Sequence, residues 1–238
     1  IMIAVFFLIL FIPNSLIFTK WTRYFVATTP FIILGASYAL KFLTFKLKLT
    51  GLVVIITLIF TTLLQCYAFL NIYIDNDSRM KASKWIYENI ESDSFILSET
   101  GNVIDIPLGF NQDKNYKIIH FDFYNLDNNF GLKNNLIENL EKSDYIFIPS
   151  RRIFMGMGKL KDKYPITHEY YQSLFSGELG FKKIKEFHSY PKILLPGTNI
   201  EIPDEEAEET WSVFDHPVIR VFQKRVSLSK EDYAKILK

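Results

Sequence analysis

The first 74 residues contain three long apolar runs without a single charged side chain. The runs cover residues 1–19, 24–40 and 49–74, which is 19, 17 and 26 residues. A helix needs about 20 residues, within a range of roughly 17–25, to cross the hydrocarbon core of a membrane. The pattern therefore predicts about three transmembrane helices. A buried helical hairpin of a soluble protein is the alternative.

After residue 74 the pattern changes to short alternating elements. Apolar runs at 94–99, 116–123 and 144–150 are typical of strands, and apolar positions at helical spacing predict helices at 78–90 and 132–143. Strands that alternate with helices at this spacing favour a parallel sheet. We therefore predict an α/β three-layer domain.

The rest of this domain is expected to contain two more helices and two more strands. An aromatic-rich helix at 168–181 should end near Gly177 or Gly180, because glycine commonly terminates helices. Strands are expected at 182–190 and 218–225, with a long excursion between them. A terminal helix should follow Ser229, which can cap its first turn.

Charge divides the chain at the same place as hydropathy. The first 74 residues carry five basic side chains and no acidic one, whereas the remainder carries 22 basic and 26 acidic side chains, a net charge of −4. This asymmetry favours a membrane part at 1–74 and a soluble domain at 75–238. We expect no nucleic-acid partner. The one cysteine, Cys66, lies in the third apolar run, so disulfide bonds cannot hold the soluble domain together.

The basic residues also predict how the chain is oriented in the membrane. Lys41, Lys46 and Lys48 outnumber Lys20 and Arg23, and basic loops tend to remain in the cytoplasm. The soluble domain is then extracytoplasmic, as are Lys20 and Arg23. The chain starts with Ile1 and its first run lacks the features of a signal peptide, so we interpret it as a piece of a longer membrane protein.

Several polar patterns along the chain resemble metal or nucleotide sites only superficially. The four histidines show no ligand spacing, and the glycine-rich stretch 156–159 lacks the residues of a phosphate loop. The acidic run at 204–209 is typical of a solvated surface, with a loose calcium site as the alternative. We therefore expect no metal and no cofactor.

Two arginines follow the strand expected at 144–150. Arg151 and Arg152 come directly after Ser150, and ligands of open parallel sheets bind at the carboxyl ends of the strands. Anion binding is one interpretation of these arginines. Pairing with nearby Glu or Asp on the surface is the other.

Lys20 and Arg23 lie between the first two apolar runs, beside Trp21 and Tyr24. Such cations can extend toward lipid headgroups without any specific ligand. Alternatively, they can bind the phosphate of a lipid-linked substrate, for which arginine offers a planar fork of donors. Tryptophan and tyrosine suit the membrane interface under either interpretation.

Three segments together resemble a known family. They are KWTRYFVATTPF at 20–31, SRMKASKWIYENI at 78–90, and the region from Pro149 to Arg225, which contains PSRRIF, KYPITHEYYQSLFSGELGF, FHSYP and AEETWSVFDHPVIRVFQKR. The chain resembles the C-terminal part of prokaryotic GT-C membrane glycosyltransferases related to the dolichyl-phosphate-mannose protein mannosyltransferases, glycosyltransferase family 39.

The resemblance implies transfer of a sugar, a hexose such as mannose, from a polyprenyl-phosphate donor to a protein or glycan acceptor outside the cytoplasm. It implies that Lys20 and Arg23 lie near the phosphate of the lipid donor. The family's acidic catalytic residues belong to an early loop that nothing here matches, so no catalytic residue is expected in this chain. A membrane-anchored α/β binding or sensing module without catalysis remains the alternative.

Overall fold

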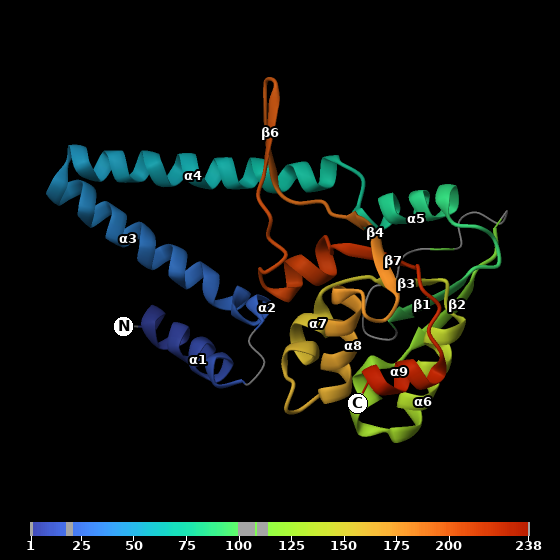
Figure 1. The fold of residues 1–238 in the computed structure, drawn as a ribbon. Coiled ribbons are helices and arrows are strands. Elements are labelled where there is room, and N and C mark those ends of the chain that lie inside the picture. The colour runs from blue at the N-terminus through green and yellow to red at the C-terminus, as the bar shows by residue number, and fades with distance from the viewer. Residues whose placement is uncertain (1, 18–20, 100–107, 109–113, 238) are drawn as a thin grey trace. The chain divides into compact units, whose positions relative to one another are not determined.

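The computed structural model describes residues 2–17, 21–99, 108 and 114–237. The chain forms two compact units (Figure 1). The first comprises residues 1–71 together with 191–202, and the second comprises residues 72–190 and 203–238. The first unit thus ends its continuous part at residue 71, and residues 191–202 belong to it rather than to the second unit.

The apolar unit consists of helices and one β-hairpin. Its helices are α1 (Met2–Leu16), α2 (Thr22–Phe25), α3 (Thr29–Leu47) and α4 (Leu49–Ile74), with a 3-10 turn at Val26–Thr28 between α2 and α3. Its hairpin pairs β5 (Lys192–Leu195) with β6 (Thr198–Glu201). This hairpin lies in the segment for which the sequence predicts a long excursion between two strands.

Two helical stretches are long and apolar enough to cross a membrane. One covers Thr22–Leu47 and the other begins at Leu49 with α4. Helix α1 has 15 residues, which is below the usual length of a span. Of the three expected spans, two are thus present as candidates by length and composition.

The expected loop at 41–48 is mostly helical. Lys41 and Lys46 both lie within α3, and the turn is confined to Lys48, whose φ is 39°. Apolar residues flank these lysines, so the helical pattern continues past them. A lysine can remain in a helix at a membrane boundary because its long stem lets the ammonium reach water.

The second unit contains a five-stranded mixed sheet in the order β2-β1-β3-β7-β4. The strands are β1 (Phe95–Glu99), β2 (Lys117–Phe121), β3 (Tyr145–Ile148), β4 (Phe181–Phe187) and β7 (Ile219–Lys224). Strand β1 pairs in parallel with both β2 and β3, as expected for this part of the chain. Strand β7 is antiparallel to β3 and to β4, so the sheet is mixed rather than purely parallel.

Helices lie on both faces of this sheet, which gives three layers. They are α5 (Ser78–Asn89), α6 (Phe130–Lys142), α7 (Arg152–Gly156), α8 (Pro165–Ser176) and α9 (Lys230–Ile236), with 3-10 turns at Phe123–Asn128 and Met157–Lys159 and a π-helical turn at Thr210–Asp215. Helix α5 buries Ala82 and Ile86 against Phe147 of β3. The opposite face carries the larger core, in which α6, α8 and α9 pack.

Strand alternation explains the two cores. Along β3, Phe147 belongs to the α5 core, whereas its neighbours Ile146 and Ile148 belong to the core under α6 and α8. Successive side chains of a strand point to opposite faces, so a continuous apolar strand fills both. This is why the apolar runs at 94–99 and 144–150 show no polar alternation.

Candidate functional site

The structure places the predicted lipid-phosphate residue Arg23 in an aromatic setting at the start of α2. The Arg23 Cζ atom lies 3.5 Å from the centroid of the Trp21 ring and 5.6 Å from that of Tyr24. The two aromatic rings are themselves stacked, with centroids 6.2 Å apart. Lys20, the other predicted residue of this site, lies outside the described residues.

Stacking leaves Arg23 able to bind an anion. The five N–H donors of a guanidinium lie in its plane, so a ring over its face does not occupy them. Residues 2–71 contain no acidic side chain. The arrangement thus combines a cation with a planar donor fork and two aromatic residues typical of a membrane interface.

A second set of polar residues gathers at the carboxyl edge of the parallel strands. Strands β2 and β3 lie on either side of β1, so the order of the strands reverses at β1. Open sheets bind their ligands beside such a switch point. Glu99 ends β1 here, and Ser150, Arg151 and Arg152 follow β3.

Glu99 is the buried carboxylate of this edge. Glu99 is only 2% exposed. The Tyr171 hydroxyl donates a hydrogen bond to Glu99 Oε1 at 2.5 Å. Burial raises the pKa of Tyr171 well above 10, and the negative charge of Glu99 raises it further. Tyr171 therefore remains a protonated donor at any physiological pH.

Tyr124 adds a hydroxyl to the same edge. Its buried oxygen has no hydrogen-bond partner within the described part of the chain, and its ring centroid lies 6.0 Å from Arg152 Cζ. Burial raises the pKa of Tyr124, while the charge of Arg152 opposes that rise. The hydroxyl is thus a neutral, buried group at the carboxyl edge of the sheet.

The predicted anion-binding arginines contact the chain's own groups. Arg151 donates from Nε to Ser212 Oγ at 2.8 Å and from a terminal nitrogen to the Ala207 carbonyl. Arg152 lies 3.8 Å from Glu209 Oε2 and 5.3 Å from the Phe214 ring centroid. Pairing with a nearby Glu is thus observed for Arg152, whereas Arg151 contacts a serine and a carbonyl.

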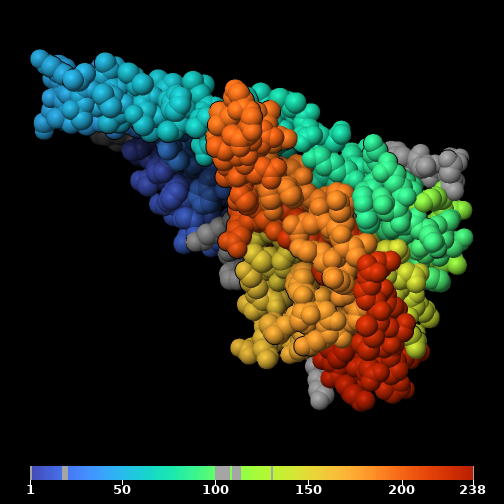
Figure 2. Space-filling view, turned by 45° about the horizontal axis from the view of Figure 1, so that its top comes forward, coloured from blue at the N-terminus to red at the C-terminus, as the bar shows by residue number. Residues whose placement is uncertain are grey.

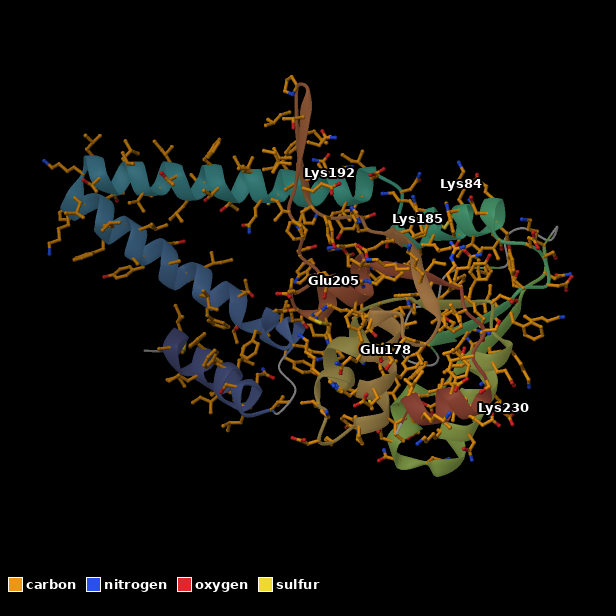
Figure 3. The ribbon with its side chains drawn as sticks, in the orientation of Figure 1. Lys84, Glu178, Lys185, Lys192, Glu205 and Lys230 are labelled. Carbon is orange, nitrogen blue, oxygen red and sulfur yellow. The ribbon has the colours of Figure 1, made fainter. Side chains whose placement is uncertain are left out.

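These contacts correct the expectation of a freely solvated acidic run. Residues 203–215, called the acidic strap below, are bound to the domain at several points. Arg220 grips Glu205 with two hydrogen bonds of 2.7 and 2.6 Å, and Glu205, labelled in Figure 3, is only 19% exposed. The sequence pattern indicated the charges but could not reveal the basic partners, which lie on distant elements.

His216 forms the other anchor of the acidic strap. Its Nε2 lies 2.9 Å from Asp204 Oδ2 and its Nδ1 lies 2.7 Å from Asp215 Oδ2. Burial alone would lower the pKa of His216, but the two carboxylates outweigh it and raise the pKa above 6.5. Within the described residues, no cluster of three or more His, Cys, Asp or Glu could hold a metal ion.

The sequence alone does not single out Glu99 or Tyr171 as site residues. A carboxylate at the end of an otherwise apolar strand was the available indication for Glu99, whereas Tyr171 looked like any aromatic core residue of α8. The edge brings together a carboxylate, two phenols and a guanidinium, which are groups that bind hydroxylated or anionic ligands. Comparison of the chain with protein-family models, with curated proteins and with solved structures gave no significant match.

Proposed function

We propose that the chain is the C-terminal part of an integral membrane glycosyltransferase. In this proposal the enzyme transfers a hexose such as mannose from a polyprenyl-phosphate donor to a protein or glycan acceptor outside the cytoplasm. The observation that carries it is Arg23, whose guanidinium stacks on Trp21 through its face, which leaves the in-plane donors uncovered by that ring, at the start of an apolar helical stretch.

The chemistry of the donor fits this position. A polyprenyl-phosphate sugar keeps its chain in the hydrocarbon and its phosphate at the interface, where Trp and Tyr are enriched. Arginine binds phosphate through two parallel hydrogen bonds, which also fix its orientation. The likeness of segments 20–31, 78–90 and 149–225 to family 39 glycosyltransferases supports the same function.

The proposal includes a topology. Helix α1 is counted as a third span beside the stretches that contain α3 and α4. Lys41, Lys46 and Lys48 remain on the cytoplasmic side, so Arg23 and the domain at 75–238 lie outside. The catalytic carboxylates are assigned to a part of the enzyme that this chain does not contain, so residues 1–238 alone should be inactive.

A second candidate function is a membrane-anchored binding or sensing module without catalysis. The buried Glu99–Tyr171 pair and the Tyr124 hydroxyl at the strand switch point favour it, because they form a polar setting independent of the membrane. The two functions differ in one respect: only the glycosyltransferase consumes a lipid-linked sugar.

Donor turnover tests the proposal. The complete membrane protein that contains this chain would be reconstituted in liposomes with radiolabelled polyprenyl-phosphate hexoses, mannose first. We expect time-dependent release of polyprenyl phosphate, the product common to all sugars, together with labelled acceptor. A protein that inserts correctly and binds the lipid but never converts any of the hexose donors would favour the binding module instead.

A further inference from the structure

The β5–β6 hairpin of the apolar unit is amphipathic. Paired residues of two strands share a face, and the pairs Ile193–Ile200 and Leu195–Thr198 alternate with Lys192–Glu201 and Leu194–Asn199. One face therefore carries Ile193, Leu195, Thr198 and Ile200, called the apolar hairpin face below. The other carries Lys192, Glu201 and Asn199, with Leu194 as its one apolar member.

Most of the apolar hairpin face is not covered by the described part of the chain, although Ile193 is half-buried. Leu195 is 46% exposed and Ile200 is 48% exposed, and every residue of β6 is exposed. A two-stranded hairpin is at best marginally stable in water and needs another surface against its apolar face. A further surface against the apolar hairpin face would therefore stabilise the hairpin.

The hairpin is attached to α4 near that helix's last turn. Asn71 Nδ2 donates to the Lys192 carbonyl oxygen at 3.0 Å, and Asn71 is only 2% exposed. Figure 1 shows the hairpin crossing α4 rather than running along it, and Lys192 is labelled at this crossing in Figure 3. In Figure 2 the hairpin stands out from the surface of α4.

The position of the attachment point along α4 determines how deep the hairpin would lie in a bilayer. At a rise of about 1.5 Å per residue, Asn71 lies roughly 33 Å from Leu49, the first residue of α4. The hydrocarbon core of a bilayer is about 30 Å thick. If α4 spans the membrane from Leu49, the hairpin crosses it at the border between hydrocarbon and headgroups.

We propose that the apolar hairpin face inserts into the interfacial zone of the bilayer around the carboxyl end of α4. This rests on the part of the proposed function that makes α4 a span. Lipid is the occupant because the hairpin is attached to α4, whose own apolar side chains, including Leu63, Leu64 and Leu70, are exposed and would contact lipid in a span. The hairpin's Lys192 and Glu201 then face headgroups and water, as in other amphipathic elements at membrane interfaces.

Site-specific fluorescence quenching tests the proposal. In a variant of the complete protein without native cysteines, which includes Cys66→Ala, a single introduced cysteine would carry an NBD fluorophore at Leu195→Cys, Ile200→Cys, Asn199→Cys or Ile59→Cys. The samples would be nanodiscs of phosphatidylcholine and phosphatidylglycerol, quenched either by doxyl-labelled lipid or by aqueous iodide. Position 199 is the matched control on the polar face, and position 59, in the middle of α4, reports the span.

We expect labels at 195 and 200 to lose more fluorescence to shallow doxyl lipid than the label at 199, with the reverse order for iodide. Two labelled positions guard against a local disturbance by either substitution. Strong iodide quenching at 195 and 200 while position 59 remains protected would overturn the hairpin proposal alone. Energy transfer between copies labelled at 195, without lipid quenching, would overturn it in favour of a second copy as the occupant. Iodide quenching at 59 as well would contradict both the hairpin proposal and the membrane function.

Discussion

Arg220 and Glu205 form a bidentate ion pair that binds the acidic strap to strand β7. The two hydrogen bonds measure 2.7 and 2.6 Å, and Arg220 Nε also lies 3.2 Å from Glu186 Oε2. The Arg220 side chain is only 12% exposed. The Arg220 charge therefore lies between two carboxylates at a position with little access to solvent.

Removing this guanidinium should release the acidic strap. We expect Arg220→Ala to lower the free energy of unfolding by about 3 kcal/mol, the lower end of the range for removing one partner of a buried ion pair. Arg220→Lys should recover only part of this stability, because an ammonium cannot make both hydrogen bonds to Glu205 in the same geometry as the guanidinium. Urea denaturation in detergent measures the loss. Arg225→Lys, at an exposed position just after β7, is the control and should change little.

The pKa of His216 predicts a pH dependence. Because its pKa is raised in the folded chain, its contribution to stability is complete below the unfolded value of about 6.5 and is lost as pH rises through the folded value. Hydrogen exchange of residues 203–216, corrected for intrinsic rates, should therefore show less protection at pH 8.5 than at pH 6. His216→Asn should abolish that difference. Equal protection of the wild-type strap at both pH values would contradict the assignment of a charged His216.

Alanine substitutions at Gly177 and Gly180 distinguish the cost of backbone strain from the cost of a steric clash. Both have positive φ, 88° at Gly177 and 77° at Gly180, but an added Cβ at Gly180 would lie 2.4 Å from the Val226 carbonyl oxygen. At Gly177 an added Cβ would lie 3.7 Å from the Phe181 carbonyl oxygen, an ordinary van der Waals contact. We expect Gly177→Ala to cost about 1 kcal/mol, from the left-handed conformation alone.

Gly180→Ala should cost clearly more than Gly177→Ala, because the backbone at Val226 must move and weaken its hydrogen bond to the Gly180 carbonyl, now 3.0 Å. Thermal unfolding of the two variants provides the comparison. Equal losses would show that the contact with Val226 relaxes without cost.

The helices and strands of the second unit were largely predictable from the sequence because their determinants are local. Asp77 caps α5 by accepting from the Arg79 amide, and Ser229 forms a capping box with Asp232 at α9. Gly177 ends α8 in the left-handed conformation, as expected for one of the two glycines named. Each of these depends on residues within a few positions of one another.

The strand order could not be predicted, because it depends on contacts between distant segments. Strand β7 comes last in the chain yet lies between β3 and β4. Its apolar alternation predicts a strand but does not specify partners or direction. The same reason applies to the acidic strap, whose binding depends on Arg151, Arg152 and Arg220. Of the candidate site residues, Arg23 could be named because its charge interrupts an apolar region, whereas Glu99 and Tyr171 only gain meaning once the sheet edge is assembled.

The proposed orientation can be tested without knowing the sugar. In sealed vesicles of known sidedness, protease should cleave residues 75–238 only from the extracytoplasmic face. Lys41, Lys46 and Lys48 are expected on the other side. Cleavage of the α/β domain from the cytoplasmic face would reverse the topology and remove Arg23 from the side where the donor phosphate is proposed to lie.

The most direct test of the central claim is sugar transfer by the complete reconstituted enzyme with Arg23 changed. Arg23→Ala removes a charge-assisted contact worth about 1.5–3 kcal/mol, so we predict a loss of roughly 10- to 150-fold in transfer efficiency per inserted molecule. Arg23→Lys should recover part of it, and Lys41→Ala, on the proposed opposite side, should retain nearly full activity. An Arg23→Ala enzyme that inserts normally and transfers sugar at the wild-type rate would contradict the account and leave Arg23 as an interfacial anchor.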